Sequence, residues 1–387
     1  GNLPIEWGED KNIAWKLAID GKAWSSPVIW GDRIWLTNAT EDGTRLAALC
    51  VDKNSGKIIH KKRLLVNPAP QYSHPFNSYA SPSPVIEQRR VYMSFGSPWT
   101  GCLDSETGEV IWERKDIQCN HFRGAGSSPF IYKDLLILHF DGSDHQFVIA
   151  LDKSTGETVW KTDRSVDYDD IDPETGRPER EGDWRKAFST PRVIEVEGKD
   201  VLLSLGAKAL YGYDPATGEE LWRLDEAESH SAGTRPVVGQ GLVFVPLGSG
   251  KGGMIAVRPG GPGAASGPQV VWRYTRVVPK RSSPLLVGDY LFVVDDGGIA
   301  ACLEAKTGEE VWKARLGGNF SASPILANGK IYFFDEEGKG TVIEAAPEFK
   351  ILAENELESG CMASPAVSGD VLFVRTKTHL YRIEEEG

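Results

Sequence analysis

A two-residue motif that ends in proline recurs eight times along this chain, and in seven copies its first residue is Ser or Thr. Each proline opens an apolar run that passes through a tight turn into a second apolar run, which predicts two short strands. Proline is tolerated at the start of a strand because it need not donate to the ladder there. Successive prolines stand 40 to 62 residues apart, about 48 on average. The copies are Ser26-Pro27, Ser83-Pro84, Ser128-Pro129, Thr190-Pro191, Arg235-Pro236, Ser283-Pro284, Ser323-Pro324 and Ser364-Pro365.

A second pattern lies between consecutive prolines, and its clearest copy runs from Ala150 to Trp160. Asp152 is predicted to open a turn through its side chain, and Gly156 to supply the positive φ that closes it. The apolar runs on either side then form a third and a fourth strand. Further copies are Asp104, Gly108 and Trp112; Asp214, Gly218 and Trp222; Glu304, Gly308 and Trp312; Asp52, Gly56 and His60; and a degenerate copy from Arg258 to Trp272 with a six-residue Gly/Pro insertion.

Eight such units of four strands predict an all-β fold, an eight-bladed β-propeller of four-stranded antiparallel blades. A Trp at a fixed distance from each turn can dock one blade on the next around a closed ring. The last unit, at about 361–384, lacks its Trp-bearing strand, whereas a lone strand at about 12–17 contains Trp15. We expect these two segments to form one sheet, which closes the ring and hides its edges. The whole chain, residues 1–387, is therefore predicted to be one domain.

Composition excludes several classes of protein. The 43 Lys and Arg against 55 Asp and Glu give a net charge of −12. The sequence also has no cluster of basic residues that could bind along the phosphate backbone of a nucleic acid, so nucleic-acid binding is not expected. No apolar run reaches the roughly 18–20 residues of a membrane span. The five cysteines form no CxxC, no CxxCH and no adjacent pair, which argues against a zinc ribbon and an attached haem.

The unit small-x-Asp-x-x-Thr-Gly-x-x-x-Trp resembles the tryptophan-docking repeat of the pyrroloquinoline quinone (PQQ)-type propellers, and the resemblance extends from Trp15 to Ile383. Two groups share this repeat. Quinoprotein alcohol dehydrogenases hold PQQ and calcium near the propeller axis, under a vicinal Cys-Cys pair that this chain lacks. Non-enzymatic relatives of the BamB type, which assemble the outer membrane, use the ring as a binding platform and are similar to this chain in length.

The resemblance implies a non-enzymatic binding or assembly scaffold, with its ligand or partner at the mouth of the central channel. The alternatives are a PQQ- and calcium-dependent alcohol or sugar dehydrogenase, and a carbohydrate-binding or carbohydrate-processing protein. No cofactor is predicted for the scaffold. We expect a monomer that is extracytoplasmic, either periplasmic or secreted. The segment that begins at Gly1 has no signal-peptide pattern, so we expect the targeting segment to lie outside this sequence.

The loops before each Ser/Thr-Pro pair lead into the innermost strands, so we expect them to gather at one mouth of the channel, where propellers collect ligands. Two longer loops, residues 61–82 and 161–188, are expected to overhang the same mouth. Polar, cationic and aromatic residues there suit an anionic or carboxylate-bearing ligand or a sugar polymer, although a water-filled channel explains them equally. The candidate ligand-binding residues are His74, Asn77, Tyr79, His121, Arg123, Trp184, Arg185, Lys186, His230, Arg235, Lys280, Arg281 and Asn319.

No catalytic residue is assigned, because no Ser-His-Asp or Cys-His set is indicated. Three histidines on separate mouth loops have the chemistry to meet at a metal, but polar lining is the preferred interpretation and no metal site is predicted. Three cysteines at one repeat position are predicted to be small buried strand residues. Cys119 and Cys361 are predicted to be free thiols.

Overall fold

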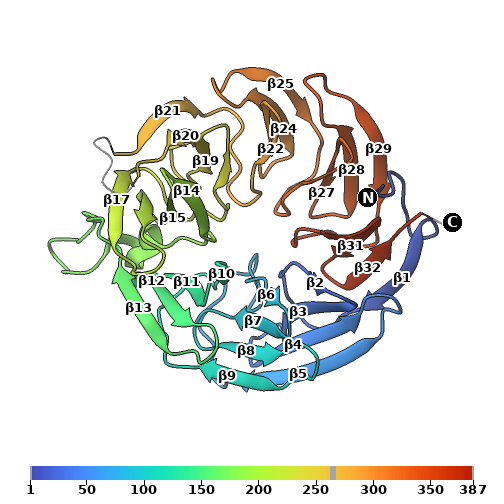
Figure 1. The fold of residues 1–387 in the computed structure, drawn as a ribbon, viewed down its shortest axis with the longest axis horizontal. Helices are drawn as coiled ribbons and strands as arrows, with labels where there is room; N and C mark the ends of the chain where they lie inside the picture. The colour runs from blue at the N-terminus through green and yellow to red at the C-terminus, as the bar shows by residue number, and fades with distance from the viewer. Residues whose placement is uncertain (1, 262–266, 386–387) are drawn as a thin grey trace.

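A computed structural model describes residues 2–261 and 267–385, and in these ranges the chain forms a ring of eight four-stranded antiparallel sheets (Figure 1). The predicted fold class is therefore confirmed. Residues 262–266, part of the Gly/Pro insertion, lie outside the described residues, as do the extreme ends of the predicted domain.

Blades 1 to 4 each use four consecutive strands, ordered from the channel outward. Blade 1 is β2 (Val28–Trp30), β3 (Arg33–Ala39), β4 (Arg45–Asp52) and β5 (Ile58–Val66). Blade 2 is β6 (Val85–Glu87), β7 (Arg90–Ser94), β8 (Thr100–Asp104) and β9 (Val110–Arg114). Blade 3 is β10 (Phe130–Tyr132), β11 (Leu135–Asp141), β12 (Gln146–Asp152) and β13 (Thr158–Asp163). Blade 4 is β14 (Arg192–Val196), β15 (Lys199–Leu205), β16 (Ala209–Tyr213) and β17 (Glu220–Asp225).

Blades 5 to 7 continue the same order, and blade 8 combines the two ends of the chain. Blade 5 is β18 (Val237–Gly239), β19 (Leu242–Pro246), β20 (Met254–Arg258) and β21 (Gln269–Tyr274). Blade 6 is β22 (Leu285–Val287), β23 (Tyr290–Val294), β24 (Ile299–Glu304) and β25 (Glu310–Arg315). Blade 7 is β26 (Ile325–Ala327), β27 (Lys330–Phe334), β28 (Lys339–Glu344) and β29 (Ile351–Glu356). Blade 8 is β30 (Ala366–Ser368), β31 (Val371–Arg375), β32 (His379–Ile383) and β1 (Ile13–Ala18).

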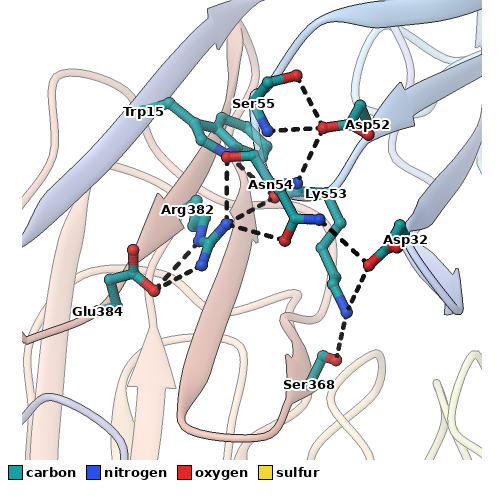
Figure 2. A network of polar contacts seen from close by, with 9 residues as sticks. All are labelled: Trp15, Asp32, Asp52, Lys53, Asn54, Ser55, Ser368, Arg382 and Glu384. Carbon is teal, nitrogen blue, oxygen red and sulfur yellow. Dashed lines mark hydrogen bonds and ion pairs between the residues drawn. The ribbon is translucent and has the colours of Figure 1, made fainter.

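The N-terminal strand closes the ring as predicted, because β1 pairs antiparallel with β32. Figure 2 shows the junction between blade 8 and blade 1. The indole nitrogen of Trp15 donates to the carbonyl of Lys53 at 3.1 Å, and Arg382 Nη1 donates to the same carbonyl at 3.2 Å. Arg382 Nη2 also pairs with Glu384 at 2.8 Å. Side chains from both ends of the chain thus hold one turn of blade 1.

The repeated tryptophans contact the turn of the following blade. The Trp112 indole nitrogen of blade 2 donates to the Lys153 carbonyl of blade 3 at 3.0 Å. Where blade 1 has His in place of Trp, His60 Nε2 lies 2.8 Å from the Glu106 carbonyl. The corresponding bonds, at 2.7 to 3.3 Å, join Trp15 to Lys53, Trp160 to Pro215, Trp222 to Gly260, Trp272 to Ala305 and Trp312 to Ala346.

The Ser/Thr-Pro motif forms a second set of bonds around the channel, in which a backbone N–H donates to the hydroxyl of the same motif in the next blade. This explains why the motif prefers Ser and Thr, since each hydroxyl is the acceptor for a neighbour. The bonds, at 2.8 to 3.0 Å, run from Ser26 to Ser83, Ser83 to Ser128, Ser128 to Thr190, Arg235 to Ser283, Ser283 to Ser323, Ser323 to Ser364 and Ser364 to Ser26.

The core lies between blades, where the second and third strands are buried on both faces. All five cysteines are buried with free thiols. The burial agrees with the prediction for the three repeat-position residues, and the free thiols agree with the prediction for Cys119 and Cys361. Burial keeps the pKa of Cys50, Cys102 and Cys302 high, at about 12. These thiols are therefore packing residues.

The two long loops begin later than predicted. Residues 61–66 belong to β5 and residues 161–163 to β13, because both outer strands continue past their docking residue. The second loop contains the helical segment η1 (Glu179–Arg185), which has three residues with positive φ. Within the described ranges, no helix has the length and apolar content that a membrane crossing needs.

Candidate functional site

All eight loops that lead into the innermost strands line one cavity of about 480 Å³ at the mouth of the channel. It includes five predicted residues: His74, Asn77, Arg123, Lys280 and Arg281. The remaining lining was not predicted and is mainly small or apolar. Most of it lies on the same loops, but Ser249 and Asp296 lie in the β19–β20 and β23–β24 turns. These residues are Trp24, Phe76, Ser81, Gly126, Phe188, Ser231, Gly233, Ser249, Asp296, Ser321 and Met362.

Carboxylates neutralise part of the predicted cationic mouth. Arg123 donates from Nε and Nη2 to the two carboxylate oxygens of Asp183 at 3.1 and 3.0 Å. Lys186, which is buried, contacts the same carboxylate. The Asp183 carboxylate comes from the segment η1, and nothing in the local sequence indicates that it reaches Arg123, 60 residues away.

Arg281 lies between two further carboxylates. It pairs with Asp296 at 3.0 Å and with Glu336 at 3.5 Å, and its guanidinium stands 4.3 Å from the centroid of the Phe76 ring. Trp24 joins this group because its indole nitrogen donates to the Phe76 carbonyl at 2.9 Å. The result is an aromatic and cationic cluster, Trp24, Phe76 and Arg281, at the rim of the cavity.

His230 lies near several cations of the mouth. Burial, followed by the charges of Lys186, Lys280 and Arg123, lowers the pKa of His230 to about 4. The ring is therefore neutral at physiological pH. It lies 6.0 Å from the ring of Trp184 and its Nδ1 is 3.0 Å from Ser231 Oγ.

Four other predicted residues serve mainly structural contacts. His121 is buried, and its Nε2 accepts a hydrogen bond from the Ser97 backbone N–H at 2.9 Å. The Tyr79 hydroxyl donates to the Gln71 carbonyl at 2.8 Å. Arg185 donates from Nε to the Asp170 carboxylate at 3.0 and 3.1 Å. Asn319 is exposed, and its backbone carbonyl accepts a hydrogen bond from the Glu336 N–H at 2.8 Å.

The described side chains do not fit the calcium that the dehydrogenase resemblance implies. Calcium takes six to eight oxygen ligands, chiefly carboxylates and carbonyls. Over residues 2–261 and 267–385, no three His, Cys, Asp or Glu side chains are grouped so as to hold a metal ion. The three histidines His74, His121 and His230 accordingly form no such group.

Comparison with known proteins finds BamB proteins among the relatives of this chain. The family described as outer membrane protein assembly factor BamB matches residues 49–178, 206–262 and 263–348. BamB of Shewanella oneidensis is 22% identical over 315 residues, which cover 76% of this chain and 72% of that protein. The solved structure of BamB from Moraxella catarrhalis has a TM-score of 0.65 at 12% identity, with 97% of both chains covered. A europium-containing methanol dehydrogenase has a TM-score of 0.56 at 12% identity, with 98% of this chain and 95% of that chain covered, a likeness of fold alone.

Proposed function

The chain belongs to the family of the outer membrane protein assembly factor BamB, and from this premise we propose that it is a non-enzymatic scaffold in outer membrane protein assembly. Its partner is a protein, bound at the mouth of the channel. The protein acts outside the cytoplasm, at the outer membrane. The chain acts by holding a partner in position, so its described residues need to supply shape and contacts rather than a reacting group.

The observation that supports the mouth as the binding surface is the rim cluster of Trp24, Phe76 and Arg281. Aromatic residues and Arg dominate the binding energy of protein interfaces because they bury large rigid surfaces. Phe76 is 39% exposed, and it is held by Trp24 at its backbone carbonyl and by Arg281 at its ring. A pre-ordered aromatic side chain loses little conformational entropy when a partner covers it.

The test is capture of outer membrane assembly proteins from a detergent extract of a bacterial envelope, with immobilised protein and identification by mass spectrometry. Wild-type protein is expected to enrich components of outer membrane protein assembly. Phe76→Ala and Arg281→Ala are each expected to lower the recovered amount about tenfold or more, as truncation of an interface anchor does.

Trp30→Ala is the matched control. Trp30 is also an exposed aromatic, 48% accessible, but it lies at the end of β2 that points away from the mouth. This variant is expected to capture the same proteins as wild type. Equal recovery by all variants would exclude the mouth as the surface, and a wild-type protein that enriches no assembly component would overturn the scaffold role itself.

A further inference from the structure

The ring of bonds formed by the Ser/Thr-Pro motif is interrupted between blades 4 and 5. The motif of blade 5 has Arg235 where the others have a hydroxyl, so no acceptor meets the backbone N–H of Thr190. Within the described part of the chain, this amide has no hydrogen-bond partner. One unpaired donor thus remains at the entrance of the innermost strand of blade 4.

Two guanidinium groups lie beside this interruption. Arg235 reaches from blade 5 past blade 4, and its guanidinium stands 5.4 Å from the ring centroid of Phe130 in blade 3. Blades 3 and 5 are not neighbours, so this contact crosses the channel wall of blade 4. Arg192, the first residue of β14 in blade 4, is close enough for its charge, after burial, to lower the pKa of Arg235.

Neither guanidinium has an acceptor in the described ranges. The side chains of Arg192 and Arg235 make no ion pair and no hydrogen bond there, in contrast to Arg123 and Arg281 at the mouth. Arg235 is exposed and Arg192 half-buried, so both retain access to the water of the channel. They do not line the mouth cavity, which places them apart from the surface of the proposed function.

Arg192 stands at a position of the repeat that is apolar in the other blades. The residue that directly follows each motif proline is apolar in seven blades, and Arg192 is the exception. The next residue is apolar in all eight blades. The sixteen positions are Val28, Ile29, Val85, Ile86, Phe130, Ile131, Arg192, Val193, Val237, Val238, Leu285, Leu286, Ile325, Leu326, Ala366 and Val367. Two like charges that lie near each other repel, and a dianion bound between them would relieve this repulsion.

We propose that Arg192, Arg235 and the Thr190 N–H form a binding site for a doubly charged oxyanion inside the channel. Two guanidinium groups match two negative charges, and their N–H groups suit the paired oxygens of a phosphate group or a carboxylate. The ligand class is therefore a phosphate or a small dicarboxylate. The Phe130 ring shields one side of the Arg235 guanidinium from water, which strengthens the pairing. This site does not depend on the role of the mouth.

The test is isothermal titration of the full chain with inorganic phosphate, succinate and acetate, at low ionic strength and mildly alkaline pH, where phosphate is a dianion. Phosphate or succinate is expected to bind with saturation, and the tighter of the two identifies the ligand chemistry. Acetate, with one charge, is expected to bind at least about tenfold more weakly. Arg235→Ser and Arg192→Val are each expected to weaken dianion binding roughly 10- to 100-fold, as loss of a charged hydrogen-bond partner does.

Both variants are chosen to fold. Arg235→Ser supplies the missing hydroxyl to the Thr190 N–H, so its melting temperature should equal or exceed that of wild type. Arg192→Val places at this position the residue type of Val28, Val85 and Val237. Lys280→Ser, at the mouth, is the matched control and should leave dianion affinity unchanged. The proposal is wrong if wild type shows no saturable binding of either dianion, if Arg235→Ser binds as tightly as wild type, or if Lys280→Ser weakens binding equally.

Discussion

The backbone N–H of Ser364 donates to the hydroxyl of Ser26 at 3.0 Å, although 338 residues separate the two in sequence. This bond joins the last blade to the first at the wall of the channel. The same bond recurs between six other pairs of motifs, so the hydroxyls form a nearly complete circle. A second closure, by Trp15 and Arg382, lies on the outer side of the same junction.

Ser83→Ala removes the acceptor of the Ser26 N–H, which lies 2.8 Å from the Ser83 hydroxyl. We expect a loss of about 1 kcal/mol in the free energy of unfolding, because a partly buried donor remains unpaired. Urea denaturation measures this loss. Ser154→Ala, which removes an exposed hydroxyl bonded to the Arg90 side chain, should cost less than about 0.5 kcal/mol. If both substitutions lowered the free energy of unfolding equally, the circle of motif hydrogen bonds would not contribute to stability.

Gly156→Ala tests the contact between a docking Trp and the next turn. A Cβ on Gly156 would stand 2.5 Å from Cε3 of Trp112, and the residue has a φ of +78°. Gly198, in the β14–β15 turn, has a φ of +75° with nothing within 4 Å of its Cβ position. Gly198→Ala is expected to cost about 1–2 kcal/mol for backbone strain alone. Gly156→Ala should cost about 1–3 kcal/mol more, because of the clash. Thermal and urea unfolding measure the stability of both variants. Equal losses in the free energy of unfolding would contradict the close packing of Trp112 against Gly156.

Asp141→Asn tests a buried ion pair within blade 3, between the last residue of β11 and the residue that directly follows β13. Arg164 donates to both oxygens of Asp141 at 2.8 and 2.7 Å, and both side chains are almost fully buried. Removal of the carboxylate charge leaves the guanidinium uncompensated, so we expect a loss of about 3–5 kcal/mol in the free energy of unfolding. Asp20→Asn removes the exposed partner of Lys61 and should cost less than about 1 kcal/mol. A loss for Asp141→Asn as small as that of the control would contradict this prediction.

His121 makes stability depend on pH. Burial lowers the pKa of His121 from its ordinary value of 6.5 to about 4, so the folded protein keeps this ring neutral. Between these values the unfolded chain binds the proton more readily, and stability therefore falls as pH falls. The contribution lost between pH 7 and pH 5 is about 2 kcal/mol. His121→Gln, which retains an acceptor for the Ser97 N–H, should show a pH dependence smaller by that amount in urea unfolding. An unchanged pH dependence would show that this ring is not the titrating group.

Much of the molecule follows from local patterns that recur. The motif prolines mark each innermost strand, and the spacing from Asp152 to Gly156 to Trp160 marks the third strand, the turn and the fourth strand of a blade. The unpaired strand at Trp15 predicts the closure with β32. Patterns of this kind are reliable because each residue acts on neighbours at a fixed distance along the chain.

For the candidate site, the sequence predicted where the site lies but not which of its charged side chains are paired. The sequence indicates that the loops before the motifs meet at one mouth, and all eight do line one cavity. It does not indicate that Asp183 reaches Arg123, because a long irregular loop carries Asp183. Nor does it indicate that Asp296 and Glu336 reach Arg281, because these carboxylates lie in the β23–β24 and β27–β28 turns of two different blades. Such pairs have no period that a sequence pattern can reveal.

The amino-acid sequence by itself determined the number of blades, the order of strands within each blade and the way the ring closes. It could do so because each copy of the repeat contains the residues that form its own strands and turns. Only the tertiary structure decided which cations are neutralised and which remain unpaired. Arg192 and Arg235 lie 43 residues apart and open different blades. They approach each other because the innermost strands of all blades converge on one axis, where residues far apart in sequence share the same wall.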